Sequence, residues 1–583
     1  MNFFEPTSAL AVLNNLYLWG LFFVLGGGTV GLVLLVQDWR RSKVTFKAIH
    51  QLETPASAKL VDQEIARLRK EDRDFDLAAF EQRAQALFAR IMDGREKGEL
   101  PPRHEVSDGV YRRELAMREI EREHGVRLVH TAIHPLEVRT IGAFHDRFFD
   151  SLHVRFSFSS RVTELSTGKN LATTRSPEEQ VTTVVWVFVR RPGAKTKKGL
   201  PAGSCPNCGA PFSGGATNLC SHCQAIGNSG QYDWVLAQEL SFDAYRGPWR
   251  EFTGLEQMNE RDPGFCPEVS EDRAALIFWK WILARTRRDP DQLRRVATPS
   301  MLQETAAEAE AYRGRGERRW IWDVQVEGVD LVLIDHDTDE DKDEVCLRVR
   351  WRGRVGDFSE GSRPVVPVSS QSTVLTLVRE SGVKTDMRTG VSSDRCHKCK
   401  AAHGEADTVK CSYCGAPLEP GKHDFVLDGA HGWETWMSVR RQRAEVAKTV
   451  EPYLPSFKFA DERLRLLQMM AAMARADGRV DSSERALLKL CAKRWGVGFR
   501  DVAPMLDCHQ PPEFDLEPGS WLARSFLEAV ITAAAIDGQI DSKERALILR
   551  LARRLRIAAP SREALAARAE QVKATRRQVE LDS

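Results

Sequence analysis

The sequence predicts a multidomain fold class: one N-terminal transmembrane helix, two α+β domains that each carry a four-cysteine ribbon, and a C-terminal all-α bundle. Three observations support this prediction: an apolar stretch at the N-terminus, a cysteine pattern that occurs twice with one spacing, and an internal repeat in an Ala- and Leu-rich C-terminal segment. A length of 583 residues agrees with several domains, because single domains usually contain about 100–200 residues.

The charge balance excludes a bulk electrostatic role in nucleic-acid binding. The chain has 84 Lys and Arg residues against 82 Asp and Glu residues, a formal net charge of +2, whereas nucleic-acid-binding domains concentrate basic residues. A hydrophobic content of 42% also excludes wholesale disorder. We therefore expect a globular protein without a nucleic-acid partner.

The apolar stretch predicts a transmembrane helix over residues 8–37. No charged residue occurs between Glu5 and Asp38, and a helix needs about 20 apolar residues to cross a bilayer. Basic residues follow the stretch and none precedes it, so the positive-inside rule puts the N-terminus outside and the following domains in the cytoplasm. The predicted location is therefore the bacterial inner membrane, with a single pass.

Two glycines in this stretch suggest a homodimer. Gly27 and Gly31 have the small-xxx-small spacing that lets two membrane helices approach closely. A lone helix tolerates the same glycines, so a monomer stays open as the alternative.

Eight of the twelve cysteines form two groups with the same spacing, Cys-x2-Cys-x11-Cys-x2-Cys. The groups are Cys205, Cys208, Cys220 and Cys223, and Cys396, Cys399, Cys411 and Cys414. Four thiolates complete the tetrahedral shell of zinc and leave no open position. We therefore expect two structural zinc sites as the cofactors of this protein, with an iron–sulfur cluster and a redox dithiol as the alternatives.

The remaining cysteines and two nearby histidines have simpler interpretations. His222 and His397 lie inside Cys-x-x-Cys turns, where we expect exposed turn residues because the four-sulfur set is complete without them. The other cysteines are isolated, and we expect buried structural thiols at Cys266, Cys346, Cys491 and Cys508.

The two cysteine groups belong to a longer repeat with a shift of about 191 residues. The segment 233–236 recurs at 424–427, and the strand-like segment 185–190 recurs at 374–379. Apolar and polar residues alternate at 152–159, and again in the second copy, which predicts half-buried strands. Each ribbon therefore interrupts a β-rich domain.

Helices are predicted before the strands of each copy. In the first copy Phe80, Ala84, Leu87 and Ile91 recur at helical spacing. In the second copy the segments 274–285 and 300–312 have the same periodicity. The order in each domain is thus helices first, then an antiparallel sheet.

These features resemble bacterial Tim-forty-four-like domains, relatives of the mitochondrial import-motor tether. The resemblance rests on the helix-then-sheet order, the strand ending in Trp-Val-Phe-Val-Arg, the inserted ribbon and the closing segment 232–236. It covers residues 76–240 and, more weakly, 266–437. It implies two nuclear-transport-factor-two-like cones, in which helices wrap a curved sheet, and a tether role through protein partners.

The C-terminal segment contains a helix–turn–helix pair made twice, at residues 476–488 and 536–548. Gly478, Val480 and Glu484 match three positions of an EF-hand loop, but Met473 and Arg475 stand where that loop needs oxygen ligands. Helix capping explains the second Asp and the Glu of each copy instead.

This Asp-Gly-x-Val/Ile-Asp-x-x-Glu pattern resembles the tellurite-resistance TerB-like family, an all-helical bundle whose acidic loops are suspected of metal or partner contacts. The resemblance implies two acidic contact patches, formed by Asp477, Asp481, Glu484, Asp537, Asp541 and Glu544.

The predicted boundaries follow from these segments. They are an extracytoplasmic tail at 1–7, the transmembrane helix at 8–37, a juxtamembrane helical linker at 38–75, the first Tim-forty-four-like domain at 76–240 with its zinc ribbon at 203–226, a linker at 241–265, the second such domain at 266–437 with its zinc ribbon at 394–417, a linker at 438–457, the TerB-like domain at 458–573 and a tail at 574–583.

The sequence contains no phosphate-binding loop, metalloprotease or nucleophile-elbow motif, so we expect no enzyme. The predicted function is a non-catalytic, membrane-anchored scaffold or tether that binds protein partners, with a link to protein translocation. Two alternatives stay open: cone domains that bind a small molecule or lipid, or act on one, and a metal or envelope stress component that acts through the acidic repeats.

Overall fold

The fold is taken from a computed structural model of the whole chain. It describes residues 55–166, 172–174, 179–197, 199–200, 203–212, 218–247, 252, 254–337, 341–359, 366–403, 409–450, 463–464, 466–468, 470–471, 488–489, 491–492, 497, 518–535, 540 and 542–571.

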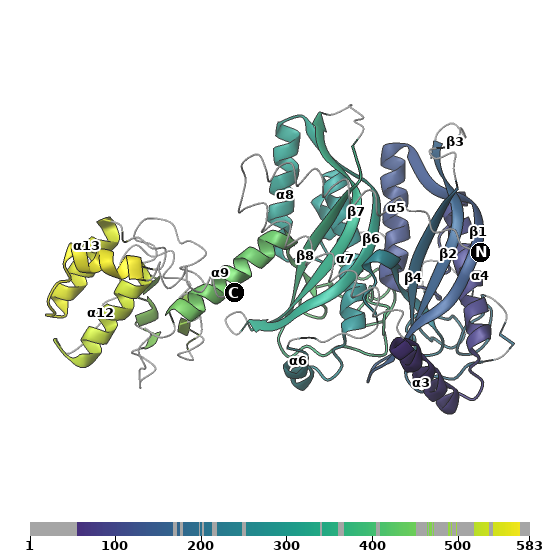
Figure 1. Cartoon of the computed structure of the whole chain (residues 1–583), viewed down its shortest axis with the longest axis horizontal. Helices are drawn as coiled ribbons and strands as arrows, with labels where there is room; N and C mark the ends of the chain where they lie inside the picture. The colour runs from purple at the N-terminus through teal and green to yellow at the C-terminus, as the bar shows by residue number, and fades with distance from the viewer. Residues whose placement is uncertain are drawn as a thin grey trace, which may run out of the picture.

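The first module, residues 55–244, consists of helices followed by an antiparallel sheet (Figure 1). Its elements are α3 (Pro55–Glu71), α4 (Leu77–Lys97), α5 (Asp108–His124), β1 (Val126–His145), β2 (Asp150–Ser166), β3 (Ala172–Thr174), β4 (Gln180–Arg190), β5 (Val235–Ser241) and the short helix η1 (Phe242–Ala244). The strand order is β1-β2-β4-β5, and β3 pairs with β2. The first ribbon lies between β4 and β5 in the sequence.

The second module, residues 255–432, repeats this order. Its elements are α6 (Leu255–Arg261), α7 (Pro267–Arg287), η2 (Pro290–Leu293), α8 (Pro299–Gly314), β6 (Glu317–Asp337), β7 (Lys342–Ser359), β8 (Ser369–Glu380) and β9 (Val426–Gly432). The strand order is β6-β7-β8-β9, with every neighbouring pair antiparallel. Helices α5 and α8, and strands β1 and β6, begin 191 residues apart, so these elements keep the shift seen between the cysteine groups.

Local signals in the sequence fix the helix ends. Ser107 caps the N-terminus of α5 and accepts a hydrogen bond from Val110 N at 3.3 Å; Thr298 does the same for α8. Gly98 and Gly125 end α4 and α5 in the left-handed conformation, which a glycine adopts without strain. A side-chain N-cap therefore begins the matching helices α5 and α8 of the two modules.

The predicted periodicities are confirmed for the described elements. The apolar residues at helical spacing are buried on α4, and the segments 274–285 and 300–312 lie in α7 and α8. The alternating segment 152–159 lies in β2, and its counterpart 345–352 lies in β7. Residues 335–337 end β6 and pair with residues 342–344 of β7 as neighbouring strands of a hairpin.

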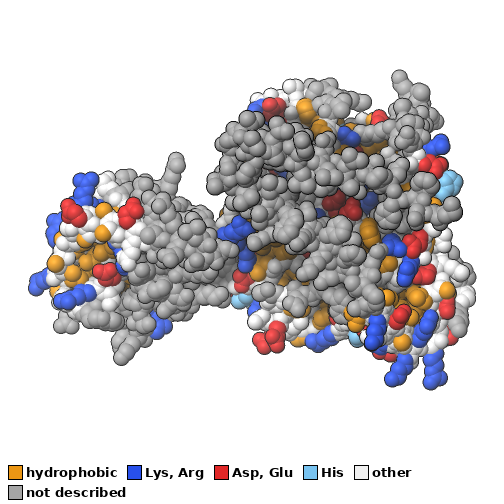
Figure 2. Space-filling model, in the orientation of Figure 1, with side chains coloured by type: hydrophobic (Ala, Val, Ile, Leu, Met, Phe, Trp, Pro, Cys, Tyr) orange, Lys and Arg blue, Asp and Glu red, His pale blue; other side chains and the backbone are white. Residues whose placement is uncertain are grey.

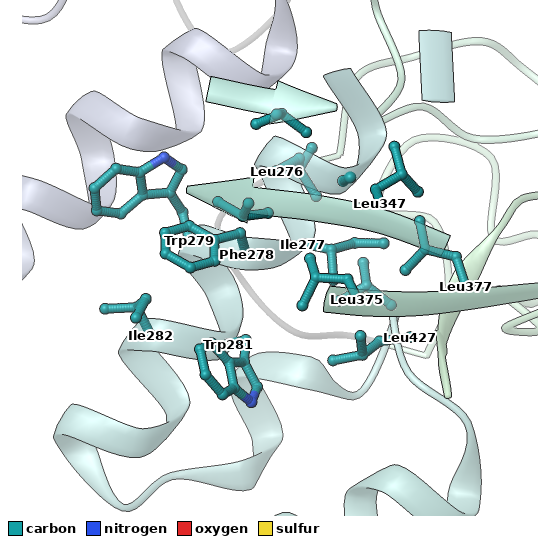
Figure 3. Close-up of a cluster of buried hydrophobic side chains, with 14 of the residues drawn as sticks. Leu276, Ile277, Phe278, Trp279, Trp281, Ile282, Leu347, Leu375, Leu377 and Leu427 are labelled. Atoms are coloured by element: carbon teal, nitrogen blue, oxygen red, sulfur yellow. The ribbon is translucent and has the colours of Figure 1, made fainter. Parts of the chain in front are cut away.

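Helix α7 is buried on nearly all sides, and it joins the two modules. Leu276, Ile277 and Phe278 belong to one apolar cluster with residues of β7, β8 and β9 (Figure 3). The same cluster includes Ala116 and Ile120 of α5, from the first module. The buried residues of α7 include charged ones as well as apolar ones, and α5 of the first module packs directly against this helix.

The fold-class prediction is wrong in this respect. It assumed a membrane-anchored chain with two cone-like α+β domains joined by a linker, and a final all-α bundle. The described structure instead has two antiparallel sheets, of five and four strands, whose modules share an apolar cluster, and the strands β5 and β6 contact each other. The physical reason is that α7 has too much apolar surface to be covered by its own module.

The predicted single-pass inner-membrane location is also corrected. Among the residues that the structure describes, no helix combines the length and the apolar character needed to cross a bilayer. The described apolar helices, α7 above all, bury their side chains against protein instead. The segment predicted to span the membrane, residues 8–37, lies outside the described residues.

The C-terminal segment has an apolar cluster of its own. Helix α9 (Trp433–Val450) leads away from the second sheet, and α12 (Trp521–Ala534), α13 (Ser542–Arg554) and a helix at 562–571 follow. Figure 1 shows α12 and α13 away from both sheets. Their buried residues, among them Phe526 and Ile548, belong to a cluster that contains no residue of either module.

The close packing of α5 on α7 depends on Gly109. A methyl group at Gly109 would lie 2.7 Å from Asp272 Oδ1 and 2.8 Å from Asp272 O, closer than a Cβ atom tolerates. We expect Gly109→Ala to lower the stability of the two modules by about 1–3 kcal/mol, the usual cost of overpacking. Calorimetric unfolding of the full chain measures this change.

The matched control is Gly314→Ala in α8. Nothing lies within 4 Å of a methyl group at Gly314, so this change should leave stability unchanged or raise it by up to about 1 kcal/mol. If Gly109→Ala unfolds at the same temperature as Gly314→Ala, the close packing of the two helices is refuted.

Candidate metal centres

Each cysteine group is built from two tight turns with one backbone pattern. In the first turn Cys205 N donates to Ala210 O at 2.7 Å, and Gly209 N donates to Cys205 O at 2.9 Å. The turns around the other cysteines make the same two hydrogen bonds at 2.8–3.0 Å. In each turn the residue that directly follows the second cysteine has a positive φ, between 59° and 76°. These residues are Gly209, Gln224, Lys400 and Gly415. This shared geometry turns both sulfurs of a pair to one side.

The structure brings together all eight predicted cysteines in the predicted groups. The four sulfurs of each group lie within 4.8 Å of one another. Two sulfur–sulfur distances in each group are 3.7 Å. Tetrahedral zinc with bonds of about 2.3 Å requires sulfurs about 3.8 Å apart. Each group could therefore hold a metal ion.

Polar hydrogens approach the sulfurs of the first group. Asn207 N lies 3.4 Å from Cys205 Sγ, and Asn207 Nδ2 lies 3.4 Å from Cys223 Sγ. Donors of this kind orient metal ligands and support the thiolate form. The corresponding position of the second group is occupied by Lys398, so the two sites differ in their surroundings.

The histidines and isolated cysteines agree largely with expectation. His222 is exposed, whereas His397 is partly covered by His423, whose ring centroid lies 3.8 Å away. Cys266, Cys346 and Cys491 are buried. Burial raises the pKa of the Cys346 thiol to about 12, as expected for an inert thiol. Cys508 lies outside the described residues.

Five of the six residues predicted to form the acidic contact patches lie outside the described residues. This applies to Asp477, Asp481, Glu484, Asp537 and Asp541. Glu544 is described: it lies in the first turn of α13 and is 8% exposed.

A buried polar network links the two cysteine groups across the contact between the modules, and sequence reasoning missed it. We call it the junction network: Asp108 and Arg112 of α5, Asp272 of α7, Asn218 of the first ribbon, and Ser392, Asp394 and Arg395 at the start of the second. All of these side chains are buried. Buried polar groups need partners, and here the partners come from both modules.

Asp108 holds the start of the second ribbon. Its Oδ2 accepts hydrogen bonds from Ser392 Oγ at 3.0 Å and from Asp394 N at 2.9 Å. Arg395, which directly precedes the second cysteine group, donates to Ser392 Oγ at 2.7 Å and to Asn218 Oδ1. A helix of the first module and the first ribbon therefore fix the backbone that leads into the second group.

The two other carboxylates of the junction network differ in protonation. Burial alone would raise the pKa of the Asp394 carboxyl, but Arg295, Arg112 and Lys280 lower it well below its usual range. For Asp272, burial and the neighbouring Asp108 carboxylate raise the pKa to about 7. Asp394 is thus ionised at neutral pH, whereas Asp272 is only partly so.

A second buried network occurs once in each module, beside the segment that enters the ribbon. Its members are Asp72, Arg190 and Thr196 in the first module, and Asp262, Arg379 and Thr385 in the second. The arginine–carboxylate distances are 2.8 and 3.0 Å, and the threonine hydroxyls donate to the same carboxylates at 2.7 and 2.6 Å. The repeat of the two strand-ending arginines was visible in the sequence; their distant acidic partners were not.

Comparisons with protein-family models, with curated proteins and with solved structures found no match to this chain.

The raised pKa of Asp272 predicts a pH dependence of stability. An unfolded Asp releases its proton near pH 3.9, whereas folded Asp272 holds it until about pH 7. Between these values the folded state binds more protons, so stability falls as pH rises from about 4 to about 7. We expect Asp272→Asn to remove this pH-dependent loss of stability. The asparagine side chain stays neutral at every pH in this range, and its oxygen can still accept the hydrogen bond from Gly109 N.

Thermal unfolding of the wild type and Asp272→Asn at a series of pH values measures the effect. The control is Asp291→Asn, an exposed carboxylate of η2, which should leave the pH profile unchanged. Parallel profiles for the wild type and Asp272→Asn would contradict the prediction.

Proposed function

We propose that each cysteine group binds one zinc ion in a structural site. Four sulfurs complete a tetrahedral shell and leave no open position for a substrate or water. The sulfur–sulfur distances of 3.7 Å support zinc, and the tie between Arg395 and Asn218 supports a role in holding the two ribbons in register.

We further propose that the protein is a non-catalytic scaffold that recruits protein partners. The observation that supports this proposal is the division of the chain into two parts. One is a fused two-module body, and the other is a C-terminal segment with a separate apolar cluster, which follows α9. Such a division lets one part hold a fixed shape while the other part binds a partner. The resemblance to tether domains and to the TerB-like family supports the same proposal.

The metal proposal predicts two zinc ions per chain. Cys205→Ser and Cys396→Ser should each reduce the content to one, because three thiolates hold zinc poorly, and each should open its ribbon to protease. Elemental analysis and limited proteolysis of the full chain measure both effects.

Cys346→Ala is the matched control, since this buried thiol lies outside both groups; it should keep two zinc ions. Stoichiometric iron with visible absorption would replace the zinc proposal with an iron–sulfur cluster. A metal-free chain with a protease-resistant ribbon would refute a structural metal altogether.

The scaffold proposal predicts partners that depend on the C-terminal segment. Cross-linking of the full chain in cells should capture proteins that are lost when residues 458–583 are removed, a deletion that leaves the apolar clusters of both modules intact. A partner counts only if the purified pair re-forms a complex of fixed stoichiometry. Identical capture by both chains would refute a recruiting role for that segment.

A further inference from the structure

The first module contains a cavity of about 350 Å³ that the proposed scaffold role does not use. Its walls come from α4, α5 and the strands β1, β2, β4 and β5, and β6 of the second module closes one side. A volume of this size lies within the range of small-molecule sites, about 300–1,000 Å³. The cavity therefore has room for a small ligand.

One wall of the cavity is formed by buried aromatic side chains. Phe88 of α4 packs against Phe158 and Trp186 with ring centroids 5.2 and 5.1 Å apart. All three side chains are at most 3% exposed. This wall offers contact to an apolar body.

A second wall carries charges that are already paired. Arg95 and Arg113 contact the carboxylates of Glu114 and Glu239 at 2.6–2.9 Å. Two cations face two anions in this group, so it is closed to an ionic ligand. Burial, with help from Arg95, lowers the pKa of the nearby His130 to about 4, so that imidazole is neutral.

The charges contributed by the second module are also paired. Arg352 lies 3.9 Å from Glu327, and Asp323 lies 3.0 Å from Arg354. Arg352, Glu327 and Asp323 line the cavity, and each has a partner of opposite charge.

Two further charged side chains that line the cavity, Arg118 and Glu121, lie one helical turn apart on α5. Arg118 Nη2 is buried and has no hydrogen-bond partner within the described part of the chain. Glu121 lies 3.4 Å from Arg127 Nε, and burial raises its pKa to about 7. A buried donor without a partner is costly, and an acceptor on a ligand would satisfy it.

We propose that this cavity binds a small amphipathic carboxylate, with its head on Arg118 and its apolar body against Phe88, Phe158 and Trp186. The cavity supplies one unsatisfied guanidinium donor, which suits the carboxylate head, and one buried aromatic wall, which suits the apolar body. A cation finds no unpaired carboxylate here, because the acidic groups that line the cavity contact arginines.

Titration of the purified full-length protein with octanoate tests the proposal, and 1-octanol serves as the neutral probe. Trp186 and Trp322 line the cavity, so their fluorescence reports occupancy. We expect saturable octanoate binding and at least tenfold weaker binding of octanol, because only octanoate has a charge-assisted hydrogen bond to Arg118.

Arg118→Met should weaken octanoate binding about tenfold and leave octanol binding within twofold. The matched control is Arg122→Met, an exposed arginine of the same helix, which should change neither. Val184→Phe, which adds a ring to the cavity wall, should abolish both and keeps the test decisive if Arg118→Met does not fold.

Three results would overturn the proposal: no saturable octanoate binding at millimolar concentrations, equal affinity for octanoate and octanol, or full octanoate affinity in Val184→Phe. These outcomes are independent of zinc content and of partner capture.

Discussion

The burial of α7 is the constraint on which the arrangement of the two modules depends. Each large apolar side chain that is fully buried contributes about 1.5–3 kcal/mol, and Phe278, Trp279 and Ile282 are all at most 1% exposed. The second sheet covers one side of this helix, and α5 of the first module covers another. Separation of the modules would return that surface to water, so the chain forms one two-module body.

The polar residues of α7 give this contact its specific geometry. Glu271 is fully buried; it accepts hydrogen bonds from Gln238 of β5 at 2.7 Å and from Leu331 N of β6 at 3.3 Å. One carboxylate thus joins the two sheets. Within the second module, Arg273 donates to Phe425 O, directly before β9, and to Ser393 O, just before the second ribbon. Apolar burial holds the modules together, and the buried Glu271 carboxylate favours one alignment of the two sheets.

Figure 2 shows basic and acidic side chains interspersed over the described part of the face in view, as the net charge of +2 indicates. The most distinctive described features are the two cysteine groups, in which Cys208 and Cys414 are exposed, the buried junction network and the cavity of the first module. The two modules share one plan, yet the junction network draws on different residues from each.

The sequence by itself determined the local elements and the two cysteine groups. Periodicity fixed α4, α7, β2 and β7, because one side of each helix or strand must be apolar, and cysteine spacing fixed which sulfurs converge, because a tight turn acts over a few residues. Only the tertiary structure decided that the modules fuse, that Asp108 meets Asp394 and that Arg118 faces a cavity. These contacts join residues hundreds of positions apart, and their energies come from burial, which no local pattern records.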